Sequence, residues 1–188
     1  MPSLIPLPAA VEWEGAEHTL TEHSTIGCCA GAGPEETGAV RAARLVLSTT
    51  TGLPLPVAEK PDILVGIDTG LPAEGYRLEV RPDGVTIAAA DRRGALWAAQ
   101  TLLQLGGDDV YPAPLGGPVK VVTARIEDVP RFAWRGVMID SARHFLQVAE
   151  ILDFIDWMAR HKLNILHWHL TDDQGWRVAS EHYPLLAE

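Results

Sequence analysis

The sequence has 188 residues, of which 47% are hydrophobic, and its formal net charge at pH 7 is −10. A chain of this length and apolar content can fold as one domain of ordinary size or as two small ones. Because its lysines and arginines form no cluster, we expect neither nucleic acid nor an anionic membrane as a partner. No apolar run approaches the ~20 residues that a membrane-spanning helix needs.

The cysteines and the first residues bear on the cellular compartment. Cys28 and Cys29 are adjacent and make a poor disulfide pair, so a reducing compartment is expected. The first eight residues lack the basic and continuous apolar segments of a signal peptide. These features predict a cytoplasmic protein, whereas a true start upstream of Met1 would allow secretion.

Local patterns predict a series of strands and helices up to residue 126. In chain order these are a short strand over residues 25–30, a helix over 34–52, a strand over 62–67, a hairpin over 75–90, a helix over 92–105 and an extended segment over 119–126. The hairpin is indicated by alternating apolar and charged side chains on both sides of Pro82-Asp83-Gly84. Asp91 is the predicted N-cap of the second helix.

These elements predict a compact α+β domain over residues 1–125, in which helices cover one face of a small sheet. A loop rich in proline and glycine, with Pro112, Pro114 and Gly116 among its residues, precedes the last extended segment. A second domain is expected over residues 126–188.

In the second domain the pattern predicts a strand, a helix and a second strand. Residues 136–142 are largely apolar apart from Asp140, residues 148–162 keep a helical period, and residues 165–170 are again extended. Asn164 is expected to adopt the left-handed conformation after the helix. Since the links are short, the two strands should be parallel and should end at the same edge of the sheet.

The segment from His167 to Trp176 carries the chemistry. His167 and His169 share one face of the predicted strand and large apolar side chains take the other, which predicts a strand buried on both sides. Two acids, Asp172 and Asp173, follow at once. In α/β proteins, loops after the carboxyl ends of strands hold the functional groups.

Three stretches of this region resemble the start of the catalytic barrel in family 20 glycoside hydrolases, the β-N-acetylhexosaminidases. They are RGVMIDSARHF at residues 135–145, HKLN at 161–164 and HWHLTDDQGWR at 167–177. The likeness covers residues 131–188 closely, and residues 1–130 resemble more loosely the α+β domain that precedes the barrel. The resemblance implies an α+β domain followed by the first strand, helix and strand of a (β/α)₈ TIM barrel.

The resemblance also implies roles for individual residues. Arg143 would bind hydroxyl groups of a terminal N-acetylglucosamine or N-acetylgalactosamine, and a guanidinium suits this role because its fork of donors can grip two oxygens. Asp172 would belong to a hydrogen-bonded network that reaches the catalytic acid. Asp173, His169 and Trp176 would support these two. Neither a cofactor nor a metal is implied.

In the family an adjacent Asp–Glu pair performs catalysis, with the substrate's acetamide oxygen as the nucleophile. No such pair occurs near the predicted strands, where the adjacent acids are Asp172 and Asp173. We therefore expect the catalytic pair beyond Glu188, and we expect the 188-residue chain alone to be inactive. Two strands cannot close a barrel, so self-association through residues 131–188 is also expected.

Other interpretations remain open for each of these residues. Arg143 could be a structural partner of Asp140 or Asp172, and one of the paired aspartates could cap a turn. The histidines could be buried and hydrogen-bonded, and Trp176 could only pack. A metal-dependent, amidohydrolase-type barrel with His167 and His169 as ligands is one alternative function, and a non-catalytic carbohydrate-binding or scaffold module is another.

Overall fold

The computed structural model describes residues 1–107, 110–111 and 116–187, which form two compact units, Met1–Arg131 and Phe132–Glu188. The division that the sequence suggested, after residue 125, lies inside strand β6 (Val119–Asp128), whose pairing with its neighbours continues to Asp128. Part of the predicted loop, at Pro112 and Pro114, lies outside the described residues.

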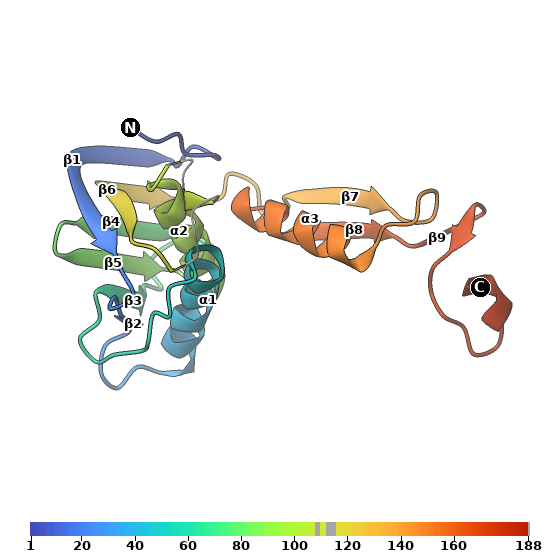
Figure 1. Ribbon diagram of the computed structural model, residues 1–188, viewed down its shortest axis with the longest axis horizontal. Helices are drawn as coiled ribbons and strands as arrows, with labels where there is room; N and C mark the ends of the chain where they lie inside the picture. Colours follow the sequence, from blue (N-terminus) through green and yellow to red (C-terminus); the bar gives the residue numbers. More distant parts are fainter. Residues whose placement is uncertain (108–109, 112–115, 188) are drawn as a thin grey trace. The chain divides into compact units, whose positions relative to one another are not determined.

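The first unit is built on a six-stranded mixed sheet with the strand order β1-β6-β4-β5-β3-β2 (Figure 1). Besides β6 its strands are β1 (Ala10–Leu20), β2 (Ile26–Gly27), β3 (Ile63–Ile67), β4 (Tyr76–Arg81) and β5 (Gly84–Ala89). Strands β2, β3 and β5 are parallel to one another, whereas β5, β4, β6 and β1 are joined by antiparallel pairing. The predicted hairpin is confirmed as β4 and β5.

Two helices, α1 (Pro34–Thr51) and α2 (Arg92–Gln104), lie on one face of this sheet and pack against each other (Figure 1). Their buried side chains and those of the strands form one apolar core, with Leu47, Ile87 and Leu102 fully buried in it. The predicted arrangement, with helices on one face of a sheet, is thus observed. Gly52 ends α1 in the left-handed conformation, with φ +72°.

The second helix is anchored at its first turn. As predicted, Asp91 is its N-cap, and its Oδ1 accepts hydrogen bonds from the backbone N–H groups of Arg93, at 2.8 Å, and Gly94, at 2.9 Å. Oδ2 also accepts from the N–H of Glu74, at 3.2 Å. One carboxylate therefore ties the helix to the segment that leads into β4.

Strand β1 was not predicted from the sequence, although it is the longest strand of the sheet. Its register against β6 shifts between Trp13 and Glu17, and Gly15 within the shift has φ +80°. Such an irregularity breaks the two-residue alternation by which a strand is recognised in a sequence. Most of its side chains are also exposed or half-buried, which removes the apolar signal.

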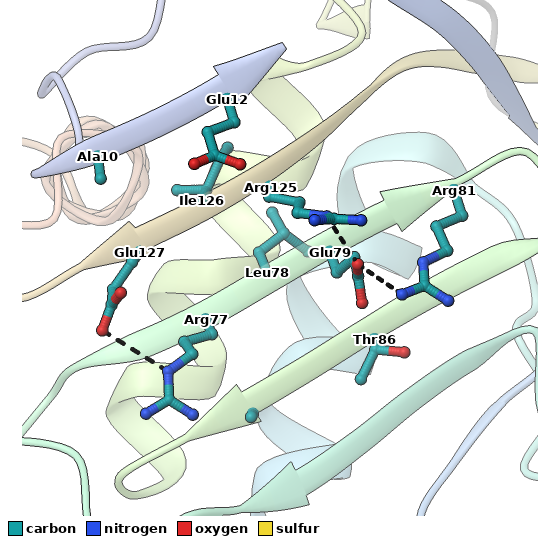
Figure 2. A pocket seen from close by; sticks show the side chains of 11 residues that line it. Ala10, Glu12, Arg77, Leu78, Glu79, Arg81, Thr86, Arg125, Ile126 and Glu127 are labelled. Atoms are coloured by element: carbon teal, nitrogen blue, oxygen red, sulfur yellow. Dashed lines mark hydrogen bonds and ion pairs between the residues drawn. The ribbon is translucent and has the colours of Figure 1, made fainter. Parts of the chain in front are cut away.

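The other face of the sheet is polar, and Figure 2 shows how its charges are arranged. Arg77 Nε lies 3.6 Å from Glu127 Oε1, and Glu79 Oε1 lies 3.0 Å from Arg125 Nε and accepts from Arg81 Nη2 at 2.7 Å. These side chains line a shallow hollow of about 510 Å³. The three arginines are paired with carboxylates, which is typical of the solvated face of an antiparallel sheet.

The second unit begins with a strand, a helix and a strand, as predicted. These are β7 (Gly136–Asp140), α3 (Val148–Arg160) and β8 (Ile165–His169), and β7 and β8 are parallel. The expectation for Asn164 is wrong, because Lys162 takes the left-handed conformation, with φ +57°. The Asn164 side chain instead accepts from Arg135 N–H and donates to the Ala133 carbonyl, which ties it to the segment before β7.

The burial predicted for β8 is also wrong for this chain. None of its five residues is buried, His167 is exposed, and His169 is half-buried. In the described chain β8 pairs with β7 alone, so it has a neighbouring strand on one side only. Both of its faces are only partly covered by other residues. Alternation alone could not reveal how much of each face is covered.

Candidate functional site

The candidate residues gather where β7 and β8 end. Asp140 and His169 are the last residues of the two strands and are partners in the parallel register. The N–H of Ser141 donates to the His169 carbonyl at 2.9 Å, which holds the two strand ends together. A pair of two-residue strands, β9 (Thr171–Asp172) and β10 (Gly175–Trp176), then folds the following loop into a hairpin.

Asp140 organises the turn that carries Arg143. Its Oδ1 accepts from the backbone N–H groups of Ala142, at 3.0 Å, and Arg143, at 3.1 Å, and its Oδ2 accepts from Arg143 Nη1. Arg143 Nη2 donates to Asp172 Oδ2 at 3.2 Å. The guanidinium is therefore held between carboxylates from both strand ends, and it contacts both of the structural partners that the sequence had offered as alternatives.

His169 lies between the same two carboxylates. Its Nε2 is 3.1 Å from Asp172 Oδ2 and 3.0 Å from the carbonyl oxygen of Thr171, and its Nδ1 is 3.6 Å from Asp140 Oδ2. When protonated, the imidazole would be a second cation between Asp140 and Asp172. Arg143, His169 and the two aspartates form one connected polar network.

Hydrogen bonds from neighbouring residues keep the acids ionised. The hydrogen bond from the Arg143 side chain, then that from its backbone N–H, lowers the pKa of Asp140 to about 2, against a smaller opposing effect of desolvation. The pKa of Asp172 is also lowered, first by a backbone hydrogen bond from Asp173 and further by the charges of Arg143 and His169. The same carboxylates raise the pKa of Arg143. At neutral pH the network carries two carboxylates and a permanent guanidinium.

The remaining candidates lie at the edge of this network. The N–H of Asp173 donates to Asp172 Oδ1 at 2.8 Å, so Asp173 helps to orient its neighbour. Trp176 donates from Nε1 to the Val178 carbonyl at 2.6 Å, and its ring is exposed. His167 pairs in register with Met138, two residues back from the cluster. The structure therefore brings Arg143, Asp172, Asp173 and His169 together, and it leaves His167 outside.

Sequence reasoning assigned no role to Arg177, which reaches across the site. Its Nε donates to the Ser141 carbonyl at 2.9 Å and its Nη2 to the Ala142 carbonyl at 3.3 Å. Trp168 was likewise noted only as apolar, but its Nε1 donates to Ser141 Oγ at 2.8 Å. The available signal was position, because Arg177 follows the paired aspartates closely within the family-like motif.

Among the residues that the structure describes, no group of three or more His, Cys, Asp or Glu side chains is arranged to hold a metal ion. Within the same described ranges, no helix is both long enough and apolar enough to cross a bilayer.

Comparison with protein families places both units in one family. The model described as glycosyl hydrolase family 20, domain 2, matches residues 1–129, and the model described as glycosyl hydrolase family 20, catalytic domain, matches residues 132–188. The chain belongs to glycosyl hydrolase family 20. The resemblance inferred from the motifs is thereby confirmed, and the charged network of this family 20 chain lies within the part that matches the catalytic domain.

Relatives with this family's activity in their names match nearly the whole chain. The beta-hexosaminidase of Porphyromonas gingivalis is 36% identical over 192 residues, which cover 99% of this chain and 25% of that protein. The beta-N-acetylhexosaminidase of Cellulomonas fimi is 37% identical, over 94% of this chain and 36% of its own length. The family 20 chain thus spans about a quarter to a little over a third of these relatives.

Solved structures of the family have the same fold over this length. The Streptomyces plicatus N-acetyl-beta-hexosaminidase, in complex with Thio-NAglucal, superposes with a TM-score of 0.82 at 38% identity and covers 98% of this chain and 38% of its own. The Vibrio harveyi exo beta-N-acetylglucosaminidase, in complex with N-acetylglucosamine, gives a TM-score of 0.84 at 31% identity, over 97% of this chain and 28% of its own.

Proposed function

We propose that the protein hydrolyses the β-glycosidic bond of terminal, non-reducing N-acetylhexosamine residues in glycans. The observation that carries this proposal is the anchoring of Arg143 by Asp140, the last residue of β7, and by Asp172, which closely follows the end of β8. This cluster lies in the segment that matches the family's catalytic domain. The relatives that match nearly the whole chain are named beta-hexosaminidases, which supports the same activity.

The fold proposal that goes with this function is a (β/α)₈ barrel, of which β7, α3 and β8 are the first strand, helix and strand. Parallel strands joined through a helix are the repeating unit of that barrel, and functional residues lie at the carboxyl ends of its strands. Asp140 and His169 occupy those ends. The first unit would be the domain that precedes the barrel.

Arg143 would bind the sugar. Asp140 and Asp172 engage two of its N–H donors, and half of its side chain is exposed, so hydroxyl oxygens can reach the guanidinium. Because the carboxylates fix the plane of the guanidinium beforehand, less conformational freedom is lost when the substrate binds. Asp172 contacts both Arg143 and His169 and would connect this network to the catalytic acid.

The chemical step would be substrate-assisted. The acetamide oxygen of the substrate would attack the anomeric carbon while a Glu donates a proton to the leaving group, and a neighbouring Asp would orient the acetamide. The 188 residues contain no Asp followed directly by Glu. We therefore expect them to hold and order the sugar without hydrolysing it, and we propose that the acid and the orienting Asp are supplied by residues outside these 188.

A hydrolysis assay tests the proposal. The longest natural form of the protein is compared on chromogenic N-acetyl-β-glucosaminide and β-glucoside, since only the former carries the acetamide nucleophile. Arg143→Ala should lower binding and turnover together, because the groups it bonded would be left unpaired. Equal turnover of both substrates would overturn the substrate-assisted mechanism. Binding of N-acetylglucosamine without turnover of either would favour a carbohydrate-binding module instead.

We also propose that the 188-residue chain self-associates through its second unit. Helix α3 exposes Val148, Leu152 and Trp157, which are 73%, 57% and 56% accessible. In the described chain β7 and β8 form a two-stranded sheet, so each has an outer edge without a neighbour. Exposed apolar surface beside open strand edges favours pairing with other chains.

A further inference from the structure

The loop that carries Arg143 is held from a second side by Arg177. The Arg177 guanidinium donates hydrogen bonds to the backbone carbonyl groups of Ser141, at 2.9 Å, and Ala142, at 3.3 Å. These carbonyls are consecutive, and the fixed fork of a guanidinium suits two acceptors side by side. Arg177 is thus hydrogen-bonded to the two residues that directly precede Arg143.

The guanidinium is itself fixed in place. Its Cζ lies 5.5 Å from the centroid of the Phe145 ring, a cation–π distance, and the backbone N–H of Arg177 donates to the Leu170 carbonyl at 3.0 Å. Arg177 therefore contacts the Arg143 loop on both sides of Arg143, through Ser141 and Ala142 before it and through Phe145 after it.

A glycine makes this approach possible. A Cβ added at Gly175 would lie 2.5 Å from the Ala142 carbonyl oxygen and 2.7 Å from Arg177 Nη2. Distances below 3.0 Å are not compatible with a real side chain, so the two loops would have to move apart. The hairpin of β9 and β10 and the Arg143 loop thus meet at a contact that only glycine permits.

We propose that Arg177 is a positioning residue that sets the place of Arg143 through the Ser141–Ala142 backbone. This inference rests on the proposed function, in which Arg143 binds the sugar. Arg177 need not touch the substrate, because its donors are directed to the two carbonyls. Asp140 and Asp172 fix the orientation of the Arg143 guanidinium, whereas Arg177 fixes the backbone from which that side chain extends.

A double-mutant cycle in the longest natural form of the protein separates this role from general stabilisation. Arg177→Ala should lower kcat/KM for the N-acetyl-β-glucosaminide by about 10- to 100-fold, the order expected when a substrate-positioning group shifts by about 1 Å. Arg177→Lys, which keeps the charge but cannot span two carbonyls, should fall between. In an Arg143→Ala background Arg177→Ala should cause little further loss, because the two residues act as one unit. The same fold-loss in both backgrounds would overturn the proposal.

A measurement without substrate keeps this inference distinct from the proposed function. In the 188-residue chain, the ¹⁵N-resolved guanidinium resonances of Arg143 should shift in Arg177→Ala. They should stay unchanged in the control Arg81→Ala, an exposed arginine of β4 paired with Glu79. If the wild-type protein hydrolyses no N-acetylhexosaminide, the function fails while a shift still supports the positioning role. Unchanged Arg143 resonances in Arg177→Ala would refute that role even in an active enzyme.

Discussion

Replacing Gly175 by alanine should loosen the contact between the two loops of the site. The added Cβ would meet the Ala142 carbonyl oxygen at 2.5 Å, whereas ordinary contact begins at 3.4 Å, so the loops must separate by about 0.9 Å. Forced repacking of this kind costs about 1–3 kcal/mol. Because the nearest atom is a backbone oxygen and not the end of a flexible side chain, little of this strain can be relieved locally.

Amide hydrogen exchange measures the effect directly. The N–H of Ser141 bonds to the His169 carbonyl across the strand ends, so its exchange reports opening of the site. A loss of 1–3 kcal/mol corresponds to exchange that is about 5- to 160-fold faster, if opening is local.

Gly66→Ala is the matched control, since a Cβ at Gly66 in β3 would meet nothing within 4 Å. Its Ser141 exchange should equal that of the wild type. If the Ser141 amide exchanges as slowly in Gly175→Ala as in Gly66→Ala, the close contact at Gly175 does not stabilise the site and the reasoning fails.

Three further predictions concern the cap, pH and association. Asp91→Ala removes the acceptor of the first α2 turn and of Glu74 N–H, and should cost about 1–2 kcal/mol in urea unfolding, with Asp91→Asn losing less; equal losses would contradict the cap. The folded pKa of Asp140 is depressed to about 2 from 3.8, so its stabilising contribution should be complete above pH 4 and lost as pH falls through 2. A carboxyl ¹³C titration with a midpoint near 4 would contradict this. In size-exclusion chromatography Val148→Glu with Leu152→Glu should shift the 188-residue chain toward monomer, and a monodisperse wild-type monomer would refute self-association.

The elements that sequence predicted well are those with local causes. The β4–β5 hairpin follows from alternation and a turn, and α2 follows from Asp91 and helical spacing. Strand β1 was missed because its register shift near Gly15 breaks the alternation, and its pairing partner, β6, is about 100 residues away in the chain. Pairing with β6 stabilises β1 although the local sequence pattern of β1 is weak. Pairing with a strand so distant in the chain cannot be recognised from a local pattern.

The site shows the same limit. The pattern and the family resemblance named Arg143, Asp172, Asp173 and His169, and the structure brings these together. The pattern also predicted that His167 is buried, which depends on what covers β8 and not on the strand itself. Arg177 was missed because its hydrogen bonds go to backbone carbonyl groups. Every residue has a carbonyl group, so the sequence does not indicate which ones an arginine contacts.

The arrangement of charges explains how a few residues orient the Arg143 guanidinium. A guanidinium beside one carboxylate could rotate, but Arg143 is held by two, Asp140 at the end of β7 and Asp172 in β9, the short strand that follows β8. Asp140 also bonds the backbone N–H of Arg143, so one carboxylate orders both the loop and the side chain. The hydrogen bonds from Arg143 lower the pKa of Asp140, and the backbone hydrogen bond from Asp173 is the main cause that lowers the pKa of Asp172. Arg143 stabilises the ionised carboxylates, and the carboxylates fix the orientation of Arg143. Removing either acid should therefore increase the mobility of the Arg143 side chain more than the loss of one hydrogen bond implies.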